Sequence, residues 1–186
     1  MVEVQGLTMQ ARALAASIAV AIAAHGAASA QDSAGPGFSG SAIVLLDSTG
    51  KVAARALNDT IMLVTLDNGV VAPALIRPVY AADGRAVSGL AIWQTGGSVL
   101  FTSVDCRMDG YVYGLSQAGV RAAAQVQTSA GVMLYAGAIG TASTVVVRSI
   151  LYDTGCVQVT VRQDGLYPVI ATVNLSAAYP PPLSLQ

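Results

Sequence analysis

The chain has 186 residues, of which 54% are hydrophobic, and nine basic residues against ten acidic ones leave a net charge near −1. The charges are scattered singly, and no basic stripe is present to neutralise a phosphate backbone, so the composition excludes nucleic acid as an expected partner. The length suits one domain with a sizeable core.

The first thirty residues have the pattern of a secretory signal peptide. Arg12 precedes an apolar run over residues 13–24, and a small-residue stretch follows. Ala28 and Ala30 place small side chains three and one residues before a cleavage point, so we predict that the mature chain begins at Gln31. The apolar run is shorter than the roughly 20 residues that a membrane-spanning helix needs. We therefore expect a periplasmic or secreted protein whose mature chain has no transmembrane segment.

The predicted mature chain contains neither histidine nor glutamate, because His25 and Glu3 both lie in the leader. Without histidine there is no Ser-His-Asp or Cys-His machinery and no His-containing zinc or copper site. General acid–base chemistry would fall to Asp, Tyr or Lys51, the single lysine. We therefore expect a non-enzymatic protein without a resident cofactor or metal ion.

A Gly/Pro-rich stretch at residues 31–40 predicts a flexible lead-in, and residues 41–179 predict a single β-rich domain. Short β-branched runs alternate there with turn residues. The expected strands are 42–46, 61–66, 70–72, 91–94, 98–103, 110–115, 121–127, 132–136, 143–152, 157–161 and 167–175. Such short strands at regular spacing predict an all-β fold, an antiparallel sandwich or a small barrel of hairpin-connected strands. A Pro-rich tail is expected at 180–186.

Local sequence patterns predict three turns and one strand with alternating apolar and polar residues. Asn68-Gly69 predicts a type I′ hairpin turn, since both residues tolerate positive φ. Residues 95–97 and 163–165 predict two further turns between strands. Valines at 157, 159 and 161 alternate with polar residues, which predicts one buried and one wet face.

Cys106 and Cys156 are the only cysteines. In a chain that enters an oxidising compartment, the pair predicts a disulfide. The alternative is two buried free thiols.

The candidate chemical groups each have a structural interpretation beside the functional one. Aspartates next to glycines cap their own turns, and Asp105 with Asp109 is too sparse for a calcium loop. A set of aromatic residues predicts core packing or, alternatively, a carbohydrate- or lipid-binding face. This set is Trp93, Phe101, Tyr111, Tyr113 and Tyr135.

Several short motifs resemble a loosely defined group of uncharacterised secreted bacterial β-rich proteins with two cysteines. They are residues 47–51 (DSTGK), 101–106 (FTSVDC), Leu134-Tyr135, Cys156, and the closing segment with Pro168-Val169, Val173–Leu175 and Pro181-Pro182. In such proteins the central cysteine is often followed by Ser-Gly, whereas residues 107–110 lengthen the turn here. The resemblance implies export, β-content and the cysteine pair, and it brings no catalytic residue.

These observations favour a non-enzymatic module that acts through its surface on an envelope or extracellular protein partner. The tail at 180–186 is expected to dock on a partner or to close a sheet edge. Two alternatives remain open: a small-ligand binder with a pocket in a barrel, and an Asp-dependent hydrolase with two carboxylates facing across a cleft.

Overall fold

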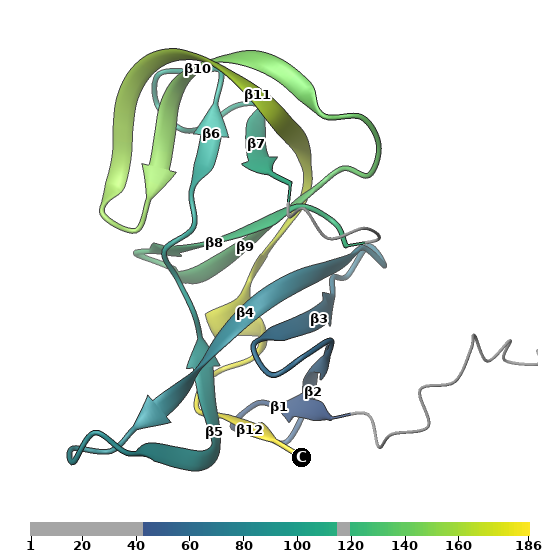
Figure 1. The fold of residues 1–186 in the computed structure, drawn as a ribbon, viewed down its shortest axis with the longest axis vertical. Helices are drawn as coiled ribbons and strands as arrows, with labels where there is room; N and C mark the ends of the chain where they lie inside the picture. Colours follow the sequence, from purple (N-terminus) through teal and green to yellow (C-terminus); the bar gives the residue numbers. More distant parts are fainter. Residues whose placement is uncertain (1–42, 115–119) are drawn as a thin grey trace, which may run out of the picture. The chain divides into compact units, whose positions relative to one another are not determined.

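The computed structural model describes residues 43–114 and 120–186 (Figure 1). The predicted leader, its cleavage site at Ala28, Ala30 and Gln31, and the lead-in at 31–40 lie outside the described residues. Within the described residues the fold is all-β apart from one short helix, as the sequence predicts, and it contains a closed antiparallel barrel and a second antiparallel sheet.

The barrel has six strands in the order β1-β12-β5-β4-β3-β2. These are β1 (Val44–Leu46), β2 (Val52–Ala56), β3 (Ile61–Thr65), β4 (Val71–Tyr80), β5 (Ala86–Trp93) and β12 (Leu183–Leu185). Fully buried Leu45, Met62, Val64 and Leu183 belong to the largest core cluster, which fills the barrel with side chains. The same cluster extends to Leu134 of the second sheet, so the main core is shared by the two sheets.

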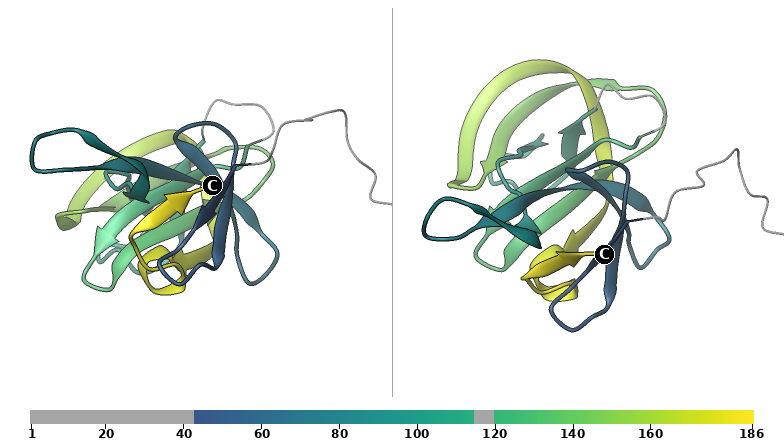
Figure 2. Two further views of the ribbon diagram at one scale, coloured as in Figure 1. Left: turned by 90° about the horizontal axis from the view of Figure 1, so that it is seen from below. Right: turned by 60° about the horizontal axis from the view of Figure 1, so that its bottom comes forward.

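The second sheet has the strand order β10-β6-β7-β11-β9-β8, with an added pairing between β10 and β11. The strands are β6 (Val99–Phe101), β7 (Gly110–Tyr113), β8 (Ala123–Thr128), β9 (Gly131–Gly137), β10 (Ser143–Tyr152) and β11 (Gly155–Asn174). Because β10 pairs with both β6 and β11, and β11 also pairs with β7, these four strands form a small ring. β11 then continues along β9, and Figure 2 shows its long curve together with β10.

One turn type recurs at three hairpins of the barrel. In residues 47–51, 66–70 and 81–85 the backbone N–H of the first residue donates a hydrogen bond to the carbonyl of the fifth. The fourth residue is in each case a glycine with positive φ. The β3–β4 hairpin is therefore present, but the predicted type I′ turn is wrong. Gly69 has a φ of 76°, whereas Asn68 keeps a negative φ and its side chain accepts a hydrogen bond from the backbone N–H of Val70. A three-residue loop with glycine in the left-handed position serves the same hairpin.

Two other predicted turns do not reverse the chain between paired strands. Residues 95–97 connect β5 of the barrel to β6 of the second sheet, so they form a crossover. Residues 163–165 lie inside β11, where the register with β10 shifts between Ser143 and Val145. Gly165 has a φ of 77°, and its left-handed backbone produces a bulge in a continuous strand.

The predicted boundary of the domain at residue 179 is wrong, because the segment 180–186 belongs to the barrel. Leu183 pairs with Ala91 of β5, and Leu185 pairs with Leu45 of β1. The helix α1 (Leu175–Ala178), capped by the Asn174 side chain, leads the chain from β11 toward this last strand. The extended segment thus closes a sheet of its own chain.

The outer edge of β8 is occupied by groups from other parts of the chain. The carbonyl of Gln125 accepts a hydrogen bond from the N–H of Gly97 at 2.9 Å, and the N–H of Gln127 donates to the Asp153 carboxylate at 2.6 Å. The side-chain amide of Gln125 also bonds to both the N–H and the carbonyl of Leu75, which ties β8 to β4. A Cβ at Gly97 would stand 2.7 Å from the Gln125 carbonyl oxygen, so this approach requires glycine.

Candidate functional site

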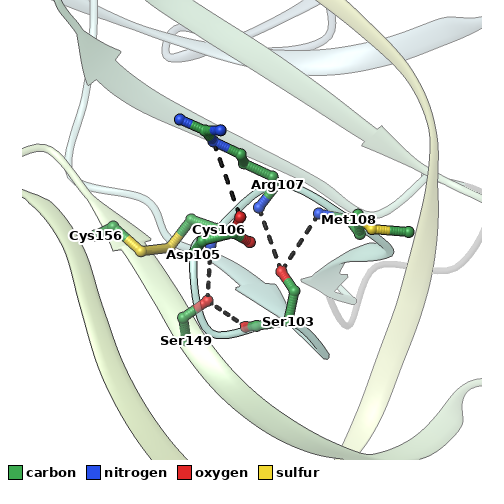
Figure 3. Close-up of polar contacts among 7 residues, drawn as sticks. All are labelled: Ser103, Asp105, Cys106, Arg107, Met108, Ser149 and Cys156. Atoms are coloured by element: carbon green, nitrogen blue, oxygen red, sulfur yellow. Dashed lines mark hydrogen bonds and ion pairs between the residues drawn. A yellow bond between two sulfur atoms is a disulfide. The ribbon is translucent and has the colours of Figure 1, made fainter.

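The two cysteines form a disulfide that joins the β6–β7 loop to β11 (Figure 3). Their Cα atoms are 6.0 Å apart, and 50 residues separate them in the sequence. Cys106 has a φ of 57°, and Asp109 in the same loop has a φ of 44°. The lengthened segment after Cys106 therefore contains two side chains in the left-handed region, where non-glycine residues are uncommon.

A buried serine supports this loop from β10. Ser149 is fully buried; its hydroxyl donates to the carbonyl of Ser103 at 2.6 Å and accepts from the N–H of Cys106 at 3.0 Å. The Ser103 hydroxyl in turn accepts two longer bonds from the N–H groups of Arg107 and Met108 (Figure 3). Sequence analysis missed Ser149, since a single serine in a β-branched run gives no signal of burial.

Asp105 and Asp109, judged too sparse for a calcium loop, each have a separate local partner. Asp105 lies 3.9 Å from the guanidinium of Arg107, and Asp109 accepts a long hydrogen bond from Thr102. Within residues 43–114 and 120–186, no group of three or more His, Cys, Asp or Glu side chains is placed to hold a metal ion. The observed contacts give these two aspartates local partners.

Asp47 is the aspartate most deeply enclosed in the structure. Its carboxylate accepts hydrogen bonds from the Thr49 hydroxyl and from the backbone N–H groups of Thr49 and Lys51, at 2.7–3.0 Å. The Thr49 hydroxyl chiefly lowers the pKa of Asp47 below its ordinary value; the two N–H groups and the charge of Lys51 add to this, while burial opposes it. The arrangement is a turn cap held in its charged form.

The five aromatic residues do not form one binding face. Trp93 is buried in the main core, where its indole N–H donates to the carbonyl of Tyr179, and Phe101 is buried in a separate cluster. Tyr135 packs against that second cluster, and burial raises its pKa above the ordinary value. Only Tyr111 and Tyr113 share a face with each other, as their spacing predicts.

An apolar face of the second sheet is open to solvent. Its buried part is a small cluster of Leu100, Val147 and Leu166, against which Tyr111, Val145, Ile150 and Val159 pack. Residues two positions away along a strand point to the same side. Three exposed side chains join this face, which we call the open face: Tyr113, Tyr152 and Val157, with exposed fractions of 43%, 40% and 47%. Tyr113 pairs with Leu166, Val157 pairs with Ile150, and Tyr152 is two residues beyond Ile150. Val161 pairs with Val147, three residues from Ile150, so it does not share the side of Val157.

The predicted buried face of 157, 159 and 161 is therefore wrong at two of its three positions. Val159 packs on the small cluster, whereas Val157 and Val161 remain exposed. β10 and β11 pair with each other over most of their length, and β6 and β7 contact only short parts of them.

One exposed tyrosine of the open face is affected by the other. Burial raises the pKa of Tyr113 above its ordinary value, and the neighbouring Tyr152 acts in the same direction. None of the ten side chains assigned to the open face and its cluster is charged. The face can therefore contribute apolar contact and two exposed phenol hydroxyls.

The surface hollows do not support hydrolytic chemistry. Four hollows between described residues have volumes of about 210–410 Å³, and their linings include a single carboxylate, Asp67. A pair of facing carboxylates is what a glycosidase-type mechanism needs. The described hollows thus give no support to the Asp-dependent hydrolase.

Comparisons with models of known protein families, with curated proteins and with solved structures find no match. The resemblance to small exported β-rich proteins therefore stays a prediction. No helix within residues 43–114 and 120–186 is long and apolar enough to cross a membrane.

Proposed function

We propose that the protein is an exported, non-enzymatic module that binds a protein partner in the bacterial envelope or outside the cell through the open face. The observation that carries the proposal is the gathering of three exposed apolar or aromatic side chains on one uncharged face of the second sheet. Exposed apolar groups of this kind mark interaction surfaces, and tyrosine is enriched there.

The disulfide supports the oxidising compartment that this role requires. The partly solvated tyrosines suit a protein interface, because each ring has an apolar body and a hydroxyl that bonds to a partner or to water. The alternative of a ligand pocket inside the barrel is less well supported, since buried side chains fill the barrel interior.

The test places a photo-crosslinking amino acid at position 157 or at position 161 in the full chain, expressed in its own cells. Val161 pairs with Val147, whereas Val157 pairs with Ile150 three residues further along β10, so the two valines point to opposite sides of the hairpin. The exposed fraction of Val161, 42%, is close to the 47% of Val157, which makes it the control.

We expect a discrete protein adduct from position 157 that is lost when Tyr152 is changed to lysine, and no adduct of that size from position 161. Equal adducts from both positions, or none from position 157 in a folded protein, would contradict the proposal. Circular dichroism of Tyr152→Lys distinguishes a lost interface from a lost fold.

A further inference from the structure

Two adjoining hollows cross the outer wall of the barrel. One has a volume of about 360 Å³ and the other about 410 Å³, and both are lined by Leu63 of β3 and Val71 of β4. These values fall in the size range of small-molecule sites. Because the hollows share two residues, they adjoin, and we call the two together the barrel groove.

The floor of the barrel groove is apolar because of the strand register. Leu63 lies directly between Arg55 of β2 and Pro73 of β4 in one cross-strand row, and Val71 lies opposite Thr65. Val71 is 43% exposed, and Ile139 at the rim is 79% exposed. Large aliphatic side chains therefore face solvent in a concave part of the wall, where an aliphatic ligand would remove them from water.

Each hollow contains one arginine and no acidic residue. Arg55 lines the first hollow and Arg121 the second. In the described chain the ion pairs within 4.0 Å are Arg85–Asp83 and Arg107–Asp105, so neither groove arginine has a carboxylate partner. Lys51 adds a third cation nearby: its ammonium lies 4.6 Å from the ring centre of Tyr179, which lines the first hollow.

The guanidinium of Arg121 is held in place by the backbone. Its Nε donates to the carbonyl of Val71 at 3.2 Å, and its Nη1 donates to the carbonyl of Gly137 at 2.7 Å. Two of its five N–H donors are used in this way, and the charge itself is not neutralised. A fixed guanidinium with free donors is suited to bind a carboxylate.

We propose that the barrel groove binds a monomeric long-chain carboxylate, with the carboxylate on Arg121 and the aliphatic chain over Val71 and Leu63 toward β2. The apolar floor fits the chain, and the two groove arginines, which have no acidic residue beside them in the linings, fit the single negative charge. The aliphatic stem of Arg55 adds apolar contact while its charged end stays in water. This site is separate from the open face and does not depend on the proposed protein partner.

The experiment titrates the purified, disulfide-bonded protein with decanoate and, separately, with 1-decanol, and follows backbone amides by two-dimensional NMR. We expect saturable shifts at Leu63, Val71 and Ile139 with decanoate, and affinity at least tenfold weaker for the alcohol. Arg121→Gln is expected to remove that preference for the anion. Loss of the two carbonyl contacts would perturb the fold, so the apo spectrum of this variant is recorded first.

Val71→Asp is a second variant that keeps the test decisive, because Val71 is exposed and its change places a negative charge in the middle of the groove. We expect it to weaken decanoate binding at least tenfold, whereas Val146→Asp, equally exposed in the second sheet, leaves binding unchanged. Equal affinity for decanol and decanoate, or no saturable shift in the groove, would overturn the proposal. Binding only to anionic phospholipid vesicles, with no binding of monomeric decanoate, would also overturn it.

Discussion

The barrel and the second sheet are stabilised by different interactions. The barrel closes on itself, and its side chains make up most of the largest core cluster. The ring of β10, β6, β7 and β11 encloses three fully or almost fully buried residues and is tied by the disulfide. The comparison teaches that buried side chains stabilise the barrel, while a disulfide supplements the smaller core of the second sheet, which leaves apolar side chains exposed.

The largest effect is expected from removing β12, the strand that closes the barrel. Deleting residues 183–186 removes Leu183, which is fully buried, and leaves β1 and β5 each without one of its two neighbouring strands. Truncating one buried leucine to alanine already costs about 2–5 kcal/mol, so we expect the deletion to abolish the folded state. Urea unfolding followed by circular dichroism measures this, with Gln186→Ala as the control. An unchanged unfolding midpoint would mean that β12 is dispensable.

The second prediction concerns the disulfide. Changing both cysteines to serine opens a loop of 50 residues, and the chain-entropy estimate gives a loss of about 4 kcal/mol in the free energy of unfolding. We expect the loss to be local, with amides of β6, β7 and the β10–β11 hairpin exchanging with deuterium faster than those of β3 and β4. Uniformly faster exchange in both sheets would remove the distinction between the two regions.

The smallest expected effect lies in the barrel and depends on pH. Because the folded pKa of Asp47 lies below its ordinary value of 3.8, the contribution of this carboxylate to stability is fully present above pH 3.8. It is lost as the pH falls through the folded pKa, where the folded state must also take up the proton. We expect Asp47→Asn to flatten the dependence of the unfolding midpoint on pH below 4. A variant whose midpoint tracks the wild type across pH 2–6 would show that Asp47 has no such role.

Local composition was sufficient to predict strands but not their neighbours. The expected strand 143–152 matches β10 residue for residue, because a β-branched run between turn residues identifies a strand. The turn at 163–165 was misplaced because a left-handed glycine serves a bulge as well as a reversal. Likewise, Gly96-Gly97 marks a bend without saying that the next strand enters another sheet.

The candidate sites depend on tertiary contacts that no single segment encodes. The disulfide was predictable because only two cysteines occur, and the structure has it. The open face was missed because an alternating valine strand normally implies a core on one side. The barrel groove brings Arg55 and Arg121 to the same depression from β2 and from the segment before β8, and their sequence positions give no sign of this proximity.

The occupied outer edge of β8 has a consequence for the behaviour of the protein at high concentration. A terminal strand with unpaired backbone groups is a template for stacking further chains. At β8 the carbonyl of Gln125 and the N–H of Gln127 already have partners in Gly97 and Asp153. This side of the sheet is therefore protected against growth into cross-β aggregates when the protein is concentrated.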